Sequence, residues 1–301
     1  MSPSLAAHSF YEANARQRVA ALLDTGSFQE LLGPQERVTS PHLRKLELPV
    51  AFDDGVIIGT GLLGGNKVLI AAQEDGFMGG SVGEVHGAKI TGLLQRALAS
   101  RPQGVLLLLD SGGVRLHEAN AGLIAVAHIL RGILQLRHAG IPCIALIGGT
   151  NGCFGGMGIV ARCCDTVIMS EEGRLGLSGP EVIETVAGVE EFDARDRALV
   201  WRTVGGKQRY LLGEAQRLVP DDIAAFRAAA LAALTLSSSF DLSALEAEHV
   251  VLENRLAHFG DCSDTLEIWN RMGLPDAEQL PLLDNEAFLA VATTIQSRRG
   301  A

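Results

Sequence analysis

The organisation of the chain depends on residues 148–158, which read GGTNGCFGGMG. Six of these eleven residues are glycine, and they lie between a predicted strand, 144–147, and a predicted helix, 159–164. Because glycine has no Cβ, such a loop can bring backbone N–H groups close to a ligand. A helix that begins near Gly155 would add its unpaired N–H groups and the positive end of its dipole. The segment predicts either a site for an oxygen that carries negative charge or a tightly packed turn.

Two further glycine pairs precede this segment at similar spacing. The pairs at 79/80, 112/113 and 148/149 are 33 and 36 residues apart, and each follows a predicted strand and precedes a predicted helix. Loops at the same end of successive strands meet in such crossover units, so an α/β fold is expected. The predicted strands are 68–72, 105–109 and 144–147, and the first two helices are 84–99 and 118–137.

Composition narrows the class of protein. The chain has 301 residues, of which 47% are hydrophobic and 5% aromatic, so the core must be mostly aliphatic. A net charge of −10 argues against nucleic-acid binding, and no apolar run approaches the ~20 residues of a membrane span. The five cysteines are odd in number and form no Cys-x-x-Cys pair, which argues against disulfides and a zinc ribbon. With no secretory signal at the start, a cytoplasmic location is expected.

Two short motifs suggest other chemistries. Residues 59–64, GTGLLG, match a dinucleotide fingerprint, but Gly64-Gly65-Asn66 predicts a hairpin turn between strands 56–61 and 67–72 instead of the required helix. Residues 79–83, GGSVG, match the nucleophile elbow of serine hydrolases, with Ser81 as the nucleophile. A polar loop separates Ser81 from the preceding strand, so a helix N-cap or a loop hydrogen bond is the favoured role and the hydrolase stays an alternative.

The segment Asp110-Ser111-Gly112-Gly113 follows a strand of four leucines. It can supply a second set of backbone N–H groups to the cavity that Gly155 and Gly156 face. Two donors from separate loops are what an oxyanion hole requires. The catalytic candidates are therefore backbone N–H groups of Gly112 or Gly113 together with Gly155 or Gly156.

Together these motifs resemble a known family. Residues 79–90, GGSVGEVHGAKI, and 110–118, DSGGVRLHE, followed by Gly155-Gly156, resemble the acyl-CoA carboxyltransferase branch of the crotonase superfamily, over about residues 10–220. The resemblance implies a crotonase-like (ClpP/crotonase) spiral of repeated ββα units with C-terminal helices. It divides the chain into an N-terminal helical arm and connector (1–45), a carboxyltransferase domain that holds the acyl thioester (46–236) and, after a linker at 237–239, a C-terminal helical extension (237–301).

Within that branch the chain is most similar to the beta subunits of biotin-independent malonate decarboxylases. No cysteine precedes Cys143, so the N-terminal zinc ribbon of the bacterial acetyl-CoA carboxylase beta subunit is missing. Val114 and His117 stand where propionyl-CoA-type enzymes often have Ala and Gln, and the loop 150–154 is longer than theirs.

The resemblance implies decarboxylation of malonyl carried as a thioester on an acyl carrier protein, with release of CO₂. The thioester would be on the carrier's phosphopantetheine-type, dephospho-CoA-derived prosthetic group, with no biotin, metal or flavin on this chain. The implied partners are a gamma subunit, the acyl carrier protein and its transferase subunit, with no nucleic acid or membrane. Two alternatives stay open: a biotin-dependent carboxyltransferase beta subunit and a non-catalytic scaffold subunit.

Individual residues receive roles from the same resemblance. Arg115 and Glu118 are expected to form an internal ion pair that holds the loop. His86, His117 or a water molecule could give a proton to the enolate, although a structural hydrogen bond is the favoured role for each histidine. The substrate-binding candidates are Gly80, Ser81, Arg115, Asn151 and Ser178.

Overall fold

The computed structural model describes residues 9–48, 52, 55–236 and 240–299, so the predicted 237–239 linker lies outside the described residues. Within these ranges the strands form one seven-stranded sheet in sequence order. The first three strands are antiparallel, and each later strand runs parallel to its neighbour. The predicted α/β class is confirmed. The strands are β1 (Gln29–Leu31), β2 (Val56–Leu63), β3 (Asn66–Gln73), β4 (Gly104–Leu108), β5 (Cys143–Ile147), β6 (Thr166–Ser170) and β7 (Arg217–Val219).

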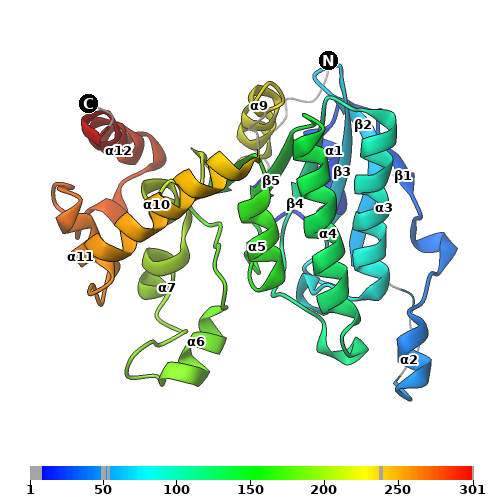
Figure 1. Cartoon of the computed structure of the whole chain (residues 1–301), viewed down its shortest axis with the longest axis horizontal. Coiled ribbons are helices and arrows are strands. Elements are labelled where there is room, and N and C mark those ends of the chain that lie inside the picture. Colours follow the sequence, from blue (N-terminus) through cyan, green and yellow to red (C-terminus); the bar gives the residue numbers. More distant parts are fainter. Residues whose placement is uncertain (1–8, 49–51, 53–54, 237–239, 300–301) are drawn as a thin grey trace.

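Helices cover both faces of this sheet and form a separate C-terminal group (Figure 1). No helix of the described residues has the length and apolar character needed to cross a membrane. The helices are α1 (Ala15–Leu22), α2 (Pro41–Lys45), α3 (Glu84–Ser100), α4 (Ala121–His138), α5 (Gly156–Cys163), α6 (Pro180–Ala187), α7 (Arg197–Val204), α8 (Gly206–Leu211), α9 (Ile223–Ala233), α10 (Leu242–Phe259), α11 (Thr265–Arg271) and α12 (Asn285–Arg299).

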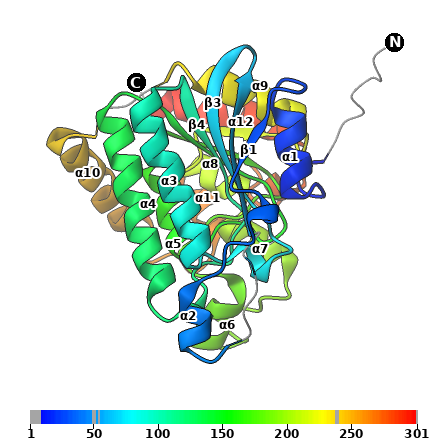
Figure 2. The same ribbon diagram turned by 90° about the vertical axis from the view of Figure 1, so that its right-hand side faces the viewer.

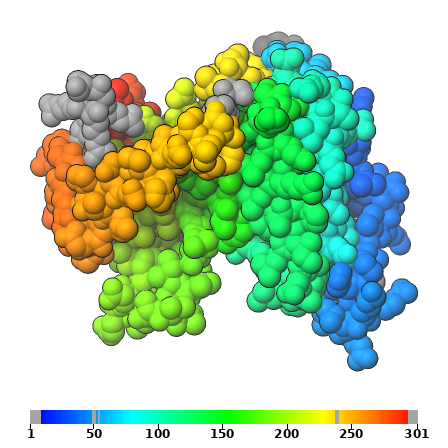
Figure 3. Space-filling view, in the orientation of Figure 1, coloured from blue at the N-terminus to red at the C-terminus, as the bar shows by residue number. Residues whose placement is uncertain are grey.

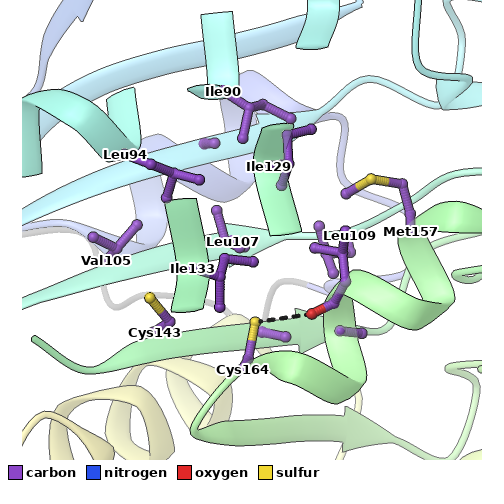
Figure 4. Close-up of a cluster of buried hydrophobic side chains, with 14 of the residues drawn as sticks. Ile90, Leu94, Val105, Leu107, Leu109, Ile129, Ile133, Cys143, Met157 and Cys164 are labelled. Atoms are coloured by element: carbon purple, nitrogen blue, oxygen red, sulfur yellow. Dashed lines mark hydrogen bonds between the residues drawn. The ribbon is translucent and has the colours of Figure 1, made fainter. Parts of the chain in front are cut away.

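Alternating residues of the central strands build two cores. Val105 and Leu107 of β4 face α3, α4 and α5 in the first core, where Cys164 also packs (Figure 4). Leu106 and Leu108 face the opposite side, in a second core with α1 and α9. Figure 2 shows the sheet between α3 and α4 on one side and α1 on the other. Each buried aliphatic side chain contributes about 1.5–3 kcal/mol to stability, which makes these two cores the main support of the fold.

The glycine hairpin forms as predicted. Leu63 of β2 pairs with Asn66 of β3, and the two residues between them have positive φ angles, 56° at Gly64 and 79° at Gly65. A two-residue turn with both φ angles positive matches the twist of the flanking strands. The dinucleotide pattern at 59–64 therefore lies in a β-hairpin, and no helix follows it.

The N-terminal segment is more closely integrated with the sheet than an arm would be. Phe10, Val19 and Leu22 are fully or almost fully buried in the second core. The ring of Phe10 stacks on that of Phe226 in α9, with ring centroids 4.1 Å apart. Helix α1 therefore covers the sheet together with α9, which comes about 200 residues later in the chain.

The C-terminal helices have a core of their own, built around Trp269 and Phe288. Helix α10 differs from them because it has no buried residue. Arg255 of α10 holds it in place by donating to Glu214 at 3.0 Å and to the Leu212 carbonyl at 2.7 Å. In the space-filling view a notch opens at the lower edge of the molecule, between the light-green region of α6 and the lower end of α4 (Figure 3).

Candidate active site

The two glycine loops lie side by side at the carboxyl ends of β4 and β5. Ser111 pairs with Cys153 in a parallel bridge: its N–H donates to the Gly152 carbonyl at 2.7 Å, and its carbonyl accepts from Phe154 N–H at 2.9 Å. Beyond the bridge the loops touch, since a Cβ built on Gly155 would lie 3.2 Å from the Cα of Gly113. The meeting of loops that the glycine spacing predicts is confirmed.

Only some of the predicted donors are available to a ligand. The N–H of Gly112 donates to the Gly79 carbonyl and that of Gly155 to the Leu177 carbonyl, each at 2.9 Å. Gly113 N–H donates to the Ser111 hydroxyl at 3.2 Å, near the long end of the usual range. Gly156 N–H, in the first turn of α5, has no acceptor among the described residues. Gly113 and Gly156 therefore offer the two least engaged N–H groups. We call the four glycines, Gly112, Gly113, Gly155 and Gly156, the rim.

Beneath the rim lies a buried carboxylate. Asp110 is fully buried, and one of its oxygens accepts from Arg18 at 2.8 Å while the other accepts from Asn151 N–H at 2.9 Å. Burial raises the pKa of Asp110 above its ordinary value, and the Arg18 guanidinium opposes that rise. Asp110 thus joins the loop after β4, the loop after β5 and helix α1.

Two glycines leave room for Asp110. A Cβ on Gly149 would lie 1.8 Å from the Asp110 carboxylate, and one on Gly80 would lie 1.9 Å from its carbonyl oxygen. Both distances are far inside van der Waals contact. We call Asp110, Gly80 and Gly149 the floor of the site. Gly80, predicted as a substrate contact, lies in this floor.

The expected ion pair between Arg115 and Glu118 forms at 2.8 Å, with both side chains buried. The other nitrogen of the Arg115 fork donates to the Ser81 carbonyl at 3.0 Å, and the second oxygen of Glu118 accepts from Glu84 N–H at 2.6 Å. The pair ties the loop after β3 to the loop after β4. A structural role for Arg115 follows from these contacts.

Two predicted substrate contacts border the rim on the β5 side. Asn151 is half-buried, and its side-chain amide donates to the Asp75 carbonyl at 3.4 Å. Ser178 is half-buried and follows Leu177, whose carbonyl holds Gly155. Both side chains lie at the edge of the loops and not in the core.

Ser81 lacks the surroundings of a nucleophile elbow. Strand β3 ends at Gln73, and the Ser81 hydroxyl donates to the Met78 carbonyl at 2.7 Å. Within the described residues no histidine hydrogen-bonds to Ser81. A serine nucleophile needs a base within hydrogen-bond reach, so this geometry does not favour the hydrolase.

The two candidate proton donors occupy opposite environments. His86 is fully buried in α3, and its Nε2 lies 3.1 Å from the side-chain nitrogen of Gln73. The Gln73 side-chain oxygen accepts from Asp110 N–H at 3.1 Å, so His86 supports the floor. His117 is exposed in the 3₁₀ turn Leu116–Glu118, which continues from the rim. Only His117 is accessible to a substrate.

The rim is partly exposed: Gly112 is exposed, Gly155 and Gly156 are half-buried, and Gly113 is buried. A cavity of about 580 Å³ lies between α3 and α4, and its lining includes neither Gly113 nor Gly156. Three exposed apolar side chains belong to segments next to the rim glycines: Leu116 (83% exposed), Leu177 (70%) and Ile159 (45%). Apolar side chains gathered around a polar site are typical of a surface that another protein covers.

The sequence analysis did not identify one important residue. Arg18 of α1 is a charged residue, yet its side chain is 1% exposed and donates to Asp110 and to the Phe10 carbonyl. The signal was present in the spacing, because Arg18 lies three residues after Ala15 and four before Leu22, on the same helical face.

Comparison with known proteins shows the family of the chain. A family model described as a carboxyl transferase domain matches residues 10–207. The malonyl-S-ACP:biotin-protein carboxyltransferase of Malonomonas rubra is 39% identical over 309 residues, covering 96% of this chain and 97% of that protein.

Solved structures extend the similarity to the fold. The chain is similar to one from a Pseudomonas malonate decarboxylase hetero-tetramer in complex with malonate, with a TM-score of 0.79 and 42% identity over 89% of this chain and 98% of that one. A transcarboxylase 12S structure with methylmalonyl-coenzyme A bound gives a TM-score of 0.60 and 27% identity, over 72% of this chain and 39% of the other. The predicted crotonase-like carboxyltransferase fold is confirmed.

Proposed function

The chain belongs to the carboxyl transferase domain family, and on that premise we propose that it is the malonyl-thioester-binding subunit of a malonate decarboxylase. In this reaction the malonyl thioester of an acyl carrier protein loses CO₂ and becomes an acetyl thioester. The observation that carries the proposal is the contact between Gly113 and Gly155, which brings together the two loops that hold the least engaged N–H groups.

The chemical problem is the electron pair left when the carbon–carbon bond breaks. As CO₂ departs, that pair delocalises onto the thioester oxygen as an enolate. Gly113 and Gly156 N–H groups aimed at this oxygen stabilise the transition state more than the substrate. Gly156 adds the positive end of the α5 dipole to its N–H.

A proton must then reach the enolate carbon to give the acetyl group. His117 is the donor that we propose, because it is exposed and continues from the rim, whereas His86 is buried beneath it. Asn151 and Ser178, at the edge of the loops, are proposed to orient the departing carboxylate. Excluding water from that end favours loss of neutral CO₂.

A partner subunit is proposed to close the site. Leu116, Ile159 and Leu177 form the apolar border that a gamma subunit would cover. The Pseudomonas relative was solved as a hetero-tetramer, and a second Pseudomonas malonate decarboxylase structure, with 40% identity, is a hetero-dimer. The carrier protein and its transferase subunit complete the proposed assembly, in the cytoplasm.

One observation favours a second candidate. The Malonomonas rubra relative is named for transfer of a carboxyl group from malonyl-S-ACP to a biotin protein, and it matches this chain over nearly its full length. In that reaction the enolate forms in the same way, but the carboxyl group becomes bonded to a biotin nitrogen instead of leaving as free CO₂. The two candidates share the rim and differ in the acceptor.

Turnover with and without biotin separates these candidates. The chain, copurified with its partner subunit, is given a malonyl-loaded carrier protein, and CO₂ is measured with and without excess avidin. We expect equal CO₂ release in both. Activity that requires an added biotin protein, and that avidin abolishes, would establish the second candidate; no loss of the malonyl carboxyl under either condition would refute both.

A matched pair of variants tests the Gly156 N–H. A Cβ at Gly156 would lie 2.8 Å from Val126, so both variants are made with Val126→Ala to provide room. Gly156→Pro removes the N–H at a helical position that accepts proline, while Gly156→Ala adds a Cβ and keeps the N–H. We expect kcat of the proline variant to be about 100- to 1,000-fold below that of the alanine variant. Equal kcat values would remove Gly156 from the oxyanion hole.

A further inference from the structure

Asp110 and Arg18 form the only charged pair of the described residues that reaches both rim loops from beneath. Asp110 precedes Ser111, and one of its oxygens holds Asn151 N–H of the other loop at 2.9 Å. Its other oxygen is held at 2.8 Å by Arg18 of α1. The Arg18 guanidinium is fixed in turn by the Phe10 carbonyl at 2.8 Å and by the Phe10 ring, 4.7 Å away.

We propose that Arg18, acting through Asp110, is a positioning residue that sets the spacing of the two rim loops and hence of the Gly113 and Gly156 N–H groups. The proposal rests on the proposed function for its kinetic readout. Arg18 touches neither rim glycine; its influence passes through the carboxylate and the Asn151 N–H.

The composition of the rim explains why the spacing must be set from beneath. Gly113 and Gly155 meet without side chains, so no side-chain packing fixes their separation. The backbone bridge at Ser111 and Cys153 holds the loops together at one point, and Asp110 supplies a second point next to it. Two donors on separate loops keep a fixed distance only while both points hold.

The glycines of the floor agree with this role. Gly149 passes so close to the Asp110 carboxylate that any side chain there would displace it. A carboxylate that served only to neutralise Arg18 would not require the second loop to be wrapped around it. Displacing catalytic groups by about 1 Å can lower the rate about 100-fold, so a loosened carboxylate has a measurable kinetic consequence.

The test compares two arginines that anchor the same N-terminal segment. Arg18→Met removes the guanidinium from Asp110. Arg227→Met is the matched control, because Arg227 of α9 pairs with Asp24 at 2.5 Å and donates to the Leu22 carbonyl, away from the rim. Both variants are studied in the assembled complex by kcat and KM for the carrier-bound malonyl thioester, and by hydrogen exchange of the amides of residues 148–156.

We expect Arg18→Met to lower kcat about 100-fold, with KM changed by less than about threefold, because the loss concerns the transition state. Amides of residues 148–156 should exchange about tenfold faster in this variant and at the wild-type rate in Arg227→Met. A merely structural role predicts that both variants lose thermal stability while kcat and the exchange of 148–156 stay unchanged. That outcome, or equal kcat losses in the two variants, would overturn the inference.

Two provisions keep the test decisive. If Arg18→Met does not fold, Arg18→Lys is used instead, because lysine keeps the charge but can make only some of the hydrogen bonds of the guanidinium. The same exchange pattern is then expected at a smaller amplitude. Unchanged exchange in this variant would overturn the inference. If the wild-type complex does not attack malonyl thioesters at all, the proposed function fails, whereas the exchange comparison still decides whether Arg18 holds the loops.

Discussion

The floor and the rim are built from glycines of neighbouring loops, but the glycines have different roles. In the floor, Gly149 and Gly80 leave space that Asp110 fills, and a Cβ on either glycine would clash with Asp110. In the rim, Gly112 has nothing nearer to its missing Cβ than the Gly79 carbonyl, 3.6 Å away. A glycine-rich loop therefore does not by itself indicate a ligand site, because its glycines can also serve close packing.

This difference separates stability from catalysis within a few residues. A change in the floor displaces a buried carboxylate and must alter both folding and turnover. A change at Gly112, the exposed glycine of the rim, alters what a substrate meets and leaves the core intact. Substitutions of equal size in the floor and in the rim should therefore differ in how they change stability and turnover.

The largest effect is expected from alanine in the floor. Gly149→Ala puts a methyl group against the Asp110 carboxylate and breaks its pairing with Arg18, so we expect a loss of about 3–5 kcal/mol in the free energy of unfolding and loss of turnover. The matched rim variant, Gly112→Ala, should change stability by less than about 0.5 kcal/mol. Urea denaturation measures both, and equal losses would abolish the distinction.

A smaller effect, purely kinetic, is expected at the exposed histidine. His117→Gln should lower kcat about 100-fold, as loss of a general acid does, with the free energy of unfolding unchanged. His86→Gln, in the support of the floor, should lower the free energy of unfolding by about 1–3 kcal/mol because it disturbs a buried hydrogen bond to Gln73. Single-turnover measurements and thermal unfolding of both variants are the check; full activity of His117→Gln would exclude it as the donor.

The smallest effect is expected at Ser81. Ser81→Ala removes one hydrogen bond to the Met78 carbonyl, so stability should fall by only about 0.5–1.5 kcal/mol and kcat should stay within about twofold of wild type. Loss of all turnover, accompanied by esterase activity in the unmodified protein, would instead support the hydrolase. This variant tests a residue that lies outside the rim, in the loop after β3.

Much of the fold could be predicted because its signals are local. The hairpin at Gly64-Gly65, the start of α5 at the rim and the three strand–loop–helix units all follow from turn chemistry and periodicity. Helix α4 begins three residues later than predicted, at Ala121, because Ala119 takes a φ of 52° that interrupts the helix. The sequence does not predict this angle, because alanine is a residue that favours helix.

The rest of the site depends on contacts between distant residues, which periodicity does not reveal. The four rim glycines were identified, but which N–H groups are engaged depends on the carbonyls of Gly79 and Leu177 in neighbouring loops. Arg18 and Asp110 are 92 residues apart, and their pairing required the topology that places α1 behind the sheet. The floor was therefore the part that only the structure could define.

The packing of α1 on α9 has a consequence for synthesis of the chain. Phe10 and Arg18 leave the ribosome early, yet the ring that covers Phe10 belongs to Phe226. At about 5–20 residues per second, translation leaves this apolar face without its partner for some 10–40 seconds. During that interval the nascent N-terminus exposes an apolar surface, and the second face of the sheet is covered only once α9 has emerged. A chain truncated before α9 would therefore remain a client of chaperones.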